Sequence, residues 1–347
     1  MQIGFLKDNE SRVSLTPSTL SKYKKLGYKV YLEKNAGTLA GYPDENYDCS
    51  KFLKNDLIEK SDVIVCVECS TIGDLKKLDN KIVISNFSSL TNNKKKEKSK
   101  SILFDLSKIP RTTIAQSMDI LSSMSGLSGY KSIIKAAELL PKMFPMMITA
   151  AGSIKPVKVV VLGAGVAGLQ AIATAKRLGA LVEASDPREA AKEEVLSLGA
   201  KFIEVEGAVE DKDAGGYAVK QTKEYLYKQK EEVSKRLKEA DVVVTTAQVV
   251  GSKSPVLISK SVVDEMKPGS VIIDIASSTG GNCELTKDNK IVVHKGVNIV
   301  GNSYLASELA HDASNLFSNN VFNFISHIIK DGKLIGDEDD ILKNCKI

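Results

Sequence analysis

The chain has 347 residues, of which 43% are hydrophobic and 26% charged, with a mean hydropathy of −0.09 and a formal net charge of +5. This length and composition are typical of a globular protein of two domains, and they exclude a disordered or fibrous chain. The positive charge comes almost entirely from lysine, and no aromatic residue interleaves the one dense lysine run, 94–100, so we expect no nucleic-acid partner.

The cysteines indicate a reducing compartment, because they are odd in number and lack a disulfide-framework spacing. Cys66 and Cys69 have the spacing of a redox or zinc pair, but Cys66 lies in the apolar run 63–67, so we expect a buried strand residue. The N-terminus reaches a charge too early for a signal peptide, and no apolar run is long enough to span a bilayer. The sequence therefore predicts a cytoplasmic protein without direct membrane insertion. Three scattered histidines are expected at surface or helix positions rather than as metal ligands: His294, His311 and His327.

The first third of the chain alternates between short apolar runs and helical or loop sequence. Threonine followed by proline at 16–17 is typical of a helix N-cap with proline at the first helical position. The alternation predicts an α/β domain of Rossmann-like architecture, and because this stretch has no glycine fingerprint it shows no obvious nucleotide site of its own. The predicted strands are 2–6, 29–33, 63–67, 81–86 and 102–106.

A helical pattern follows over 116–139, where apolar residues recur at steps of three and four. Gly126 and Gly129 interrupt this pattern, so a kinked or broken connecting helix is expected. Pro141 and Pro145 then mark a boundary before the next element.

The stretch 157–188 carries the strongest motif. An apolar run ends on the sequence Gly163-Ala164-Gly165-Val166-Ala167-Gly168, an alanine-rich helical stretch follows, and a second apolar run closes on Asp186. Strand, glycine turn, helix, strand and acidic end occur in the order that a dinucleotide-binding βαβ unit requires. In this motif the first glycine allows a sharp turn, the second lets the backbone approach a pyrophosphate, and the third allows close packing of helix and strand. The alternative is a glycine turn that binds no nucleotide.

Asp186 decides the expected cofactor. A carboxylate at the end of the second strand accepts the hydroxyls of an adenosine ribose and repels a 2′-phosphate, which favours NAD over NADP. Arg188 argues in the opposite direction, because an arginine near this position can hold a 2′-phosphate. The carboxylate is the stronger determinant, so the sequence predicts NAD.

The remainder of the chain continues the alternation of strands and helices, with a polar glycine-containing stretch at 206–217. The fold class that follows is α/β, with two Rossmann-like domains that contain parallel sheets and are joined by long helices, the second domain carrying the glycine motif. We expect the first domain to comprise 1–125 and 308–347, with a returning C-terminal helix, and the second to comprise 126–307. The predicted elements are strands at 202–205, 242–246, 271–275, 291–294 and 297–300, and helices near 188–198, 218–239 and 305–330.

With these motifs laid out, the chain resembles the soluble NAD(H)-binding domain I of proton-translocating nicotinamide nucleotide transhydrogenases, which share a superfamily with alanine dehydrogenases. Nearly the whole chain takes part, including an opening that contains Arg12-Val-Ser-Leu-Thr-Pro17 and a segment at 111–124 that resembles the Arg-Gln-Asp loop of the transhydrogenases. Asp213-Ala-Gly-Gly-Tyr217 resembles the mobile loop of the family, and 245–251 and 280–284 also match, with Gln248 in place of the usual leucine. The segment 300–310 departs from the proline-rich pattern of the family, which puts its partner contact in doubt.

The resemblance implies a Re/Si-specific transhydrogenase that is active only with its partner subunits. This chain would bind NAD(H) as a homodimer. An NADP(H)-binding beta subunit, with membrane subunits alpha-2 and beta, would supply NADP(H) and couple hydride transfer to proton translocation, leaving this chain peripheral on the inner face of the cytoplasmic membrane. The residues implied in catalysis are Arg111, Gln116, Asp119, Ser122 and Tyr217, and those implied in cofactor binding are Arg111, Thr112, Thr113, Gln116, Ser117, Met118, Asp119, Gly163, Ala164, Gly165, Val166, Gly168, Asp186, Pro187, Arg188, Gly216, Tyr217, Gln229 and Gln248; no metal is implied.

The Arg-Gln-Asp segment is also consistent with this role on physical grounds. Arg111 and Asp119 can pair if the segment between them folds back, and Ser122 lies one helical turn after Asp119. Gln116 offers a neutral donor and acceptor suited to a ribose or an amide. By resemblance, Gln116 reaches toward the NADP(H) of the partner, whereas Arg111, Asp119 and Ser122 hold the nicotinamide. The alternative is an ordinary surface ion pair beside an idle glutamine, just as Tyr217 could be an ordinary loop tyrosine.

Two other functions remain as alternatives. An alanine dehydrogenase needs a cation and an acid–base group beside the substrate carbonyl. The corresponding positions of that family fall at Glu68, Ser88 and Ser278 here, and only Arg12 is kept. The second alternative is an NAD(H)-binding protein without enzymatic activity, which the divergent segment at 300–310 motivates.

Overall fold

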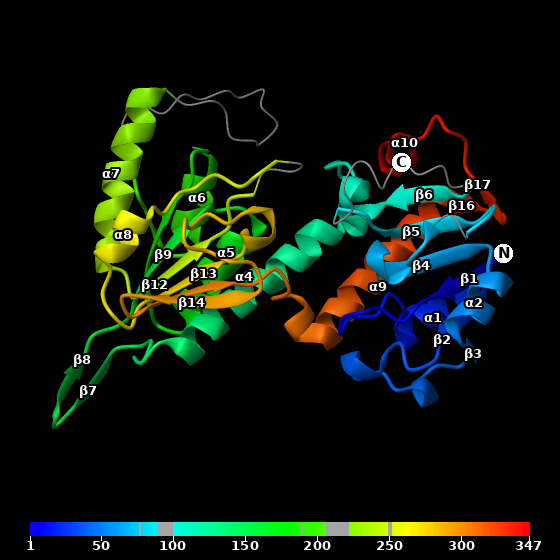
Figure 1. Cartoon of the computed structure of the whole chain (residues 1–347), viewed down its shortest axis with the longest axis horizontal. Helices are drawn as coiled ribbons and strands as arrows, with labels where there is room; N and C mark the ends of the chain where they lie inside the picture. The colour runs from blue at the N-terminus through cyan, green and yellow to red at the C-terminus, as the bar shows by residue number, and fades with distance from the viewer. Residues whose placement is uncertain (76–77, 89–99, 189, 206–221, 249–251) are drawn as a thin grey trace. The chain divides into compact units, whose positions relative to one another are not determined.

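The computed structural model describes residues 1–75, 78–88, 100–188, 190–205, 222–248 and 252–347. The chain divides into two compact units, which are described separately below. Unit 1 comprises Met1–Met124 with Ala306–Ile347, and unit 2 comprises Ser125–Leu305. Figure 1 labels the elements of both units.

Unit 1 is built on a six-stranded parallel sheet with the strand order β3-β2-β1-β4-β5-β6. This is the order of a classic Rossmann sheet, so the predicted architecture is confirmed. The sequence analysis missed only β3, whose three residues contain no apolar run. The strands are β1 (Gln2–Phe5), β2 (Lys29–Glu33), β3 (Ser50–Phe52), β4 (Val63–Glu68), β5 (Ile82–Asn86) and β6 (Ile102–Asp105).

Local sequence signals account for the first helix and for the buried cysteine. Thr16 caps α1 (Pro17–Lys25) in a capping box with Thr19, as the Thr-Pro pair predicts. Cys66 is fully buried in β4, as expected, and its thiol donates to the Ser85 hydroxyl over 3.3 Å. Burial raises the pKa of the Cys66 thiol well above its ordinary value, which keeps the thiol protonated.

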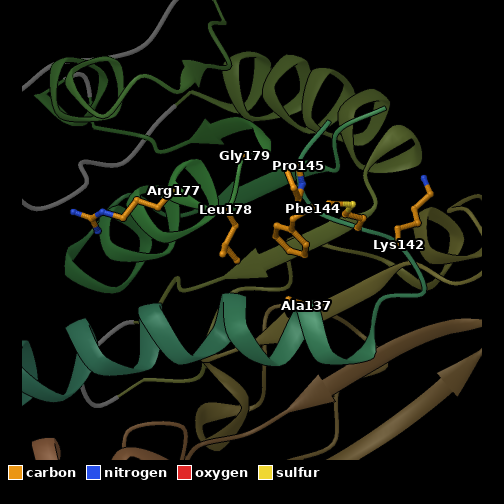
Figure 2. A pocket seen from close by; sticks show the side chains of 8 residues that line it. Ala137, Lys142, Phe144, Pro145, Arg177, Leu178 and Gly179 are labelled. Atoms are coloured by element: carbon orange, nitrogen blue, oxygen red, sulfur yellow. The ribbon is translucent and has the colours of Figure 1, made fainter. Parts of the chain in front are cut away.

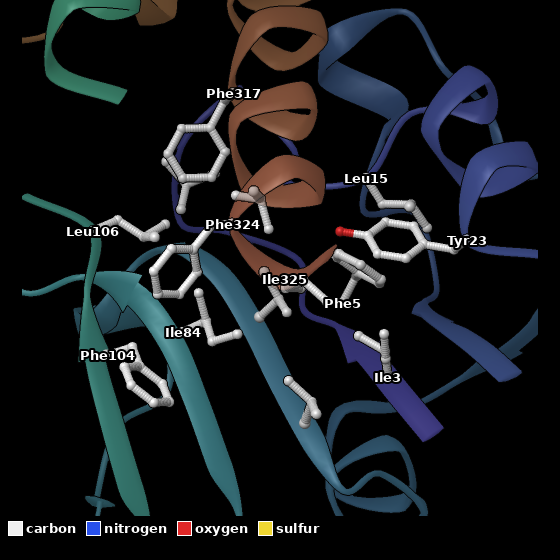
Figure 3. Close-up of a cluster of buried hydrophobic side chains, with 14 of the residues drawn as sticks. Ile3, Phe5, Leu15, Tyr23, Ile84, Phe104, Leu106, Phe317, Phe324 and Ile325 are labelled. Carbon is white, nitrogen blue, oxygen red and sulfur yellow. The ribbon is translucent and has the colours of Figure 1, made fainter. Parts of the chain in front are cut away.

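The C-terminal segment supplies some of the core of unit 1. Helix α9 (Ala310–Ile328) inserts Phe317, Phe324 and Ile325 among side chains of the sheet, which Figure 3 shows beside Phe5 and Ile84. Each such fully buried side chain stabilises the fold by roughly 1.5–3 kcal/mol. The smaller elements of unit 1 are α2 (Lys54–Lys60), α10 (Asp340–Cys345), β16 (Ile329–Lys330) and β17 (Lys333–Leu334).

Helix α4 (Ile120–Leu139) begins in unit 1 and ends in unit 2 without interruption, so the prediction of a kinked or broken helix is wrong. The glycines have a different purpose. A Cβ atom at Gly129 would overlap the backbone carbonyl of Ala167, in helix α5 (Val166–Arg177). Gly129 is therefore a point of close approach between two helices rather than a break in one of them.

Unit 2 contains a seven-stranded sheet with the order β11-β10-β9-β12-β13-β15-β14. All neighbours pair in parallel except β14 and β15, which are antiparallel. Only two residues, Lys295 and Gly296, separate these strands, and both have positive φ, as a tight hairpin turn requires. The strands are β9 (Lys158–Leu162), β10 (Leu181–Ser185), β11 (Lys201–Phe202), β12 (Val242–Thr245), β13 (Val271–Asp274), β14 (Lys290–His294) and β15 (Val297–Gly301).

The remaining elements of unit 2 include one hairpin that the sequence analysis missed, β7 (Met147–Thr149) with β8 (Gly152–Ile154). Every residue of both strands is exposed. The other helices are α6 (Ala190–Ser197), α7 (Lys223–Glu239) and α8 (Lys260–Asp264). Within the described residues, no helix is both long enough and apolar enough to cross a membrane.

Candidate nucleotide site

The glycine turn between β9 and α5 shows three separate uses of glycine. Gly163 has a φ of +99°, and a Cβ atom there would lie 2.5 Å from the Thr246 hydroxyl. At Gly168 a Cβ atom would overlap the carbonyl oxygen of Gly163. At Gly165, in contrast, nothing lies within 4 Å of the position that a Cβ would take. The first and third glycines therefore serve the turn and the packing, whereas the second leaves an open cradle in front of the helix.

The N-terminus of α5 points into this cradle. Gly165 is the N-cap and offers no side-chain acceptor, so the first amide groups of the helix have no side-chain cap. Val166, the next residue, is 49% exposed, and Ala164 is buried beneath the turn. An uncapped helix N-terminus with open space in front of it is suited to a phosphate group. The residues present therefore fit the pyrophosphate of a dinucleotide.

Asp186 lies at the end of β10 and is tied to the same turn. Its Oδ2 atom accepts from the Ala164 backbone over 2.8 Å and from Arg188 Nη2 over 3.0 Å. Its Oδ1 atom accepts from the backbone and Nε of Arg188, both over 2.9 Å. The bond to Asp186 raises the pKa of Arg188 above its ordinary value. Arg188 therefore saturates the carboxylate in this structure, and a ribose hydroxyl would compete with the guanidinium for it.

The outcomes for the other predicted residues of unit 2 differ. Gln229, on α7, donates to the Ser185 hydroxyl at the end of β10 over 3.5 Å. Gln248 is exposed after β12, and Pro187 is half-buried beside Asp186. Gly216 and Tyr217 lie outside the described residues.

Asn282 is a buried residue that the sequence analysis did not single out. Its Oδ1 atom accepts from the Ala247 backbone over 3.0 Å, and its Nδ2 atom donates to the carbonyls of Ala247 and Pro255 over 2.9 and 2.8 Å. These bonds fix the backbone directly before Gln248. Its place in the matching motif at 280–284 was the only available signal.

In unit 1, the segment with Arg111 and Gln116 presents its polar side chains to solvent while two apolar residues anchor it. Ala115 and Met118 are buried in the core, within the 3-10 helix Ala115–Met118. The side chains of this segment that remain exposed are those of Arg111, Thr112, Thr113, Gln116 and Ser117. The segment is thus a fixed turn with an open polar surface.

Asp119 and Ser122 make the contact that their spacing predicts. The Ser122 hydroxyl donates to Asp119 Oδ2 over 2.5 Å, and the Ser122 backbone donates to Oδ1 over 3.0 Å, so Asp119 caps the first turn of α4. The expected pairing of Arg111 with Asp119 is wrong: among the described residues, no ion pair joins them. The cap orients the aspartate toward its own helix, because two donors of that helix lie directly after it.

A buried charged network lies where the carboxyl ends of β1, β4 and β5 meet. Arg12 pairs with Glu10 over 2.6 Å and lies 3.7 Å from Glu68, which accepts from Asn86 over 2.9 Å. Burial raises the pKa of Glu68 to about 7 and that of the neighbouring Asp8 to about 6. In both cases the loss of hydration outweighs the charges and hydrogen bonds that favour the ionised form.

These shifts predict a pH dependence of stability. Because the pKa of Glu68 is raised in the folded state, its contribution to stability is complete at acidic pH and is lost as the pH rises through about 7. The Glu68→Gln substitution is therefore expected to lessen the fall in melting temperature between about pH 5 and about pH 8. Glu59→Gln, at an exposed position, is the control. An unchanged pH slope in Glu68→Gln contradicts the shift.

A separate hollow of about 500 Å³ lies in unit 2 (Figure 2). Its lining includes Leu178 and Gly179, which follow the C-terminus of α5. Helix α5 has 12 residues, so this hollow is about 18 Å from the glycine turn. It is therefore distinct from the candidate nucleotide site. Its other lining residues are Ala137, Lys142, Met143, Phe144, Pro145 and Arg177.

Comparisons with known proteins agree with this geometry. The models of the alanine dehydrogenase/PNT N-terminal and C-terminal domains match residues 6–128 and 132–347. The chain is 41% identical to the first of the separate pieces of NAD(P) transhydrogenase subunit alpha from Rickettsia prowazekii, over 98% of this chain and 92% of that protein. A solved transhydrogenase from Sinorhizobium meliloti superposes with a TM-score of 0.89 at 36% identity, covering 100% of this chain and 98% of that one. A solved L-alanine dehydrogenase shares the fold, with a TM-score of 0.80 at 21% identity and coverage of 100% and 94%.

Proposed function

The chain belongs to the alanine dehydrogenase/PNT family, and within that family we propose that it is the NAD(H)-binding component of a proton-translocating nicotinamide nucleotide transhydrogenase. The observation that carries the proposal is the open cradle at Gly165 in front of the uncapped N-terminus of α5. In this proposal Gly163, Ala164, Gly165, Val166 and Gly168 hold the pyrophosphate of NAD(H), and Asp186, Pro187 and Arg188 surround its adenosine ribose. Tyr217 and Gly216 close over the nucleotide, with Gln229 and Gln248 at its edges.

The segment of unit 1 that contains Arg111, Gln116 and Asp119 would serve the nicotinamide end. Reduced nicotinamide supplies a hydride, and no nucleophile or acid–base group of the protein is needed for its transfer, so the task of this chain is positioning. Ser122 donates its hydroxyl proton to Asp119, which leaves lone pairs of its oxygen to accept from a carboxamide NH₂ group. Gln116 is exposed and would reach the NADP(H) held by the partner. Thr112, Thr113, Ser117 and Met118 complete the proposed contacts.

The partners follow from the same proposal. An NADP(H)-binding beta subunit would receive or donate the hydride, and membrane subunits would couple this transfer to a proton. This chain would be peripheral, held at the inner face of the cytoplasmic membrane by those subunits.

A fluorescence experiment tests the proposal. The chain contains no tryptophan, so bound NADH can be followed with little protein background. We expect NADH binding, no NADH oxidation on addition of pyruvate and ammonium, and NADH oxidation by NADP⁺ once the NADP(H)-binding component is added. Oxidation by pyruvate and ammonium alone would instead indicate an alanine dehydrogenase. Binding without any turnover in the presence of the partner would indicate an NAD(H)-binding protein that is not an enzyme.

The pairing of Asp186 with Arg188 predicts a change of cofactor preference. In the Asp186→Ala variant, NADH loses an acceptor and the released guanidinium can pair with a 2′-phosphate. Because a hydrogen bond to a charged group contributes about 1.5–3 kcal/mol, the ratio of NADH to NADPH affinity should fall by about 10- to 100-fold. Adding Arg188→Ala to this variant should remove the gain in NADPH affinity. A double variant that still gains NADPH affinity would exclude Arg188 as its source.

The hairpin of β7 and β8 supports the proposed homodimer. Ile148 is 73% exposed and Ile154 41%, and apolar side chains of this kind are characteristic of interfaces. Ile148→Asp is expected to weaken self-association at least about tenfold in sedimentation experiments, because a charge would have to be buried. Leu196→Asp, at a 50% exposed apolar position of α6, is the control. Equal effects of the two substitutions would exclude the hairpin as the specific contact.

A further inference from the structure

Two asparagines of α9 converge on one backbone atom of the Arg-Gln-Asp segment. Asn320 Nδ2 donates to the Ser117 carbonyl oxygen over 2.9 Å, and Asn323 Nδ2 donates to the same oxygen over 3.0 Å. The two asparagines are three residues apart and so lie on one face of the helix. Together they occupy both lone pairs of a carbonyl in the last turn of the 3-10 helix Ala115–Met118.

The orientation of the Asn320 amide is determined by this contact. Asn320 is 6% exposed, and its Oδ1 atom has no hydrogen-bond partner among the described residues. Rotating the amide by half a turn would place Oδ1 against the Ser117 oxygen, and two acceptors would then repel each other. A buried acceptor without a partner is unfavourable, so the arrangement is consistent with a specific requirement for the donor at Ser117.

The contact fixes the backbone between the two ends of the segment. Ala115 and Met118 are anchored in the core, and Asp119 is fixed as the cap of α4. Ser117 lies between these anchors and directly follows Gln116, whose side chain is exposed. Holding the Ser117 carbonyl therefore sets the direction in which Gln116 leaves the backbone.

We propose that Asn320 and Asn323 are positioning residues for hydride transfer, which act by holding the Ser117 carbonyl and thereby the backbone of Gln116. This proposal rests on the transhydrogenase function proposed above. Neither asparagine touches the nucleotide in it. The effect of losing them should fall on turnover rather than on NADH binding, because misplacement of a group by about 1 Å can lower a rate about 100-fold.

The test compares Asn320→Ala and Asn323→Ala with Asn319→Ala. Asn319 is the matched control, because its amide donates to Asn315 of its own helix over 2.7 Å and not to the segment. Each chain is combined with the NADP(H)-binding component, and NADH affinity, melting temperature and the rate of hydride transfer are measured. We expect the two variants to lose at least about tenfold in rate with NADH affinity within about twofold of wild type, and the control to lose nothing.

Two further variants separate positioning from folding. Asn320→Asp keeps the shape and removes the donor, so it should be as slow as Asn320→Ala. Asn323 is only half-buried, so Asn323→Ala remains informative if the Asn320 variants do not fold. Normal rates in folded variants, beside an active wild-type chain, would overturn the proposal. An inactive wild-type complex would instead contradict the proposed function.

A readout without the partner is limited tryptic cleavage after Arg111, located by mass spectrometry. Release of the Ser117 carbonyl should let this exposed segment open more often, and local opening is what allows cleavage. We expect cleavage to be several-fold faster in Asn320→Ala and Asn323→Ala than in Asn319→Ala. Equal cleavage rates in all three variants would contradict the positioning role.

Discussion

Replacing Gly165 by alanine is expected to weaken NADH binding at least about 100-fold while leaving the melting temperature within a few degrees of wild type. Nothing in the protein lies within 4 Å of the new methyl group, and Gly165 has a φ of −77°, which alanine adopts without strain. The methyl group would fill the cradle in front of α5 instead. Fluorescence titration with NADH measures the loss, and thermal unfolding without nucleotide measures the fold.

Gly168→Ala is the matched comparison, because the same methyl group there would overlap the Gly163 carbonyl. Strand and helix would have to move apart, and we expect a loss of about 3 kcal/mol or more in the free energy of unfolding. The two substitutions should therefore separate binding from packing within one turn. If Gly165→Ala binds NADH normally, the nucleotide does not use this cradle and the proposed function loses its main support.

The second large effect is expected at Gln116. Gln116→Ala should lower the rate of hydride transfer to the partner by about 100-fold or more, because the catalytic task is positioning and Gln116 is the neutral polar group proposed to reach the second nucleotide. Its side chain is exposed, so little stability should be lost. Stopped-flow measurement of NADH oxidation by NADP⁺ in the mixed complex reports the rate.

NADH titration and thermal unfolding of the same Gln116→Ala preparation are the controls, and both should match wild type. A rate within about threefold of wild type would assign the glutamine no positioning role. Loss of NADH affinity would place Gln116 on the NAD(H) side rather than the NADP(H) side.

The regular elements of the fold were predictable because their signals are local. Apolar runs gave the strands of both sheets, and Thr16-Pro17 marked the start of α1. The failures arise where tertiary contacts decide. Gly129 breaks a helical pattern in the sequence but serves the approach of α5, and the turn at Lys295 and Gly296 reverses one edge strand. Short exposed elements such as the β7–β8 hairpin carry no core pattern to detect.

The candidate site divides in the same way. The glycine turn and Asp186 follow from spacing within one βαβ unit, so their arrangement could be predicted. The partner of Asp119 could not, because helix capping by Ser122 competes with the ion pair that charge alone suggests. Asn282 and Asn320 act through backbone atoms distant in sequence, and single asparagines carry no pattern that would reveal such contacts.

The discontinuity of unit 1 has a consequence for the synthesis of the protein. The ribosome completes the continuous segment Ser125–Leu305 before it adds Ala310–Ile328, whose aromatic side chains fill the core of unit 1. The nascent first unit must therefore wait, with some of its apolar surface uncovered, until the whole of unit 2 has emerged. At about 5–20 residues per second this wait lasts on the order of 10–40 seconds, an interval in which chaperones or premature pairing can act on the chain. Arrest of translation after Leu305 should leave a product that folds its nucleotide-binding unit and aggregates through the other.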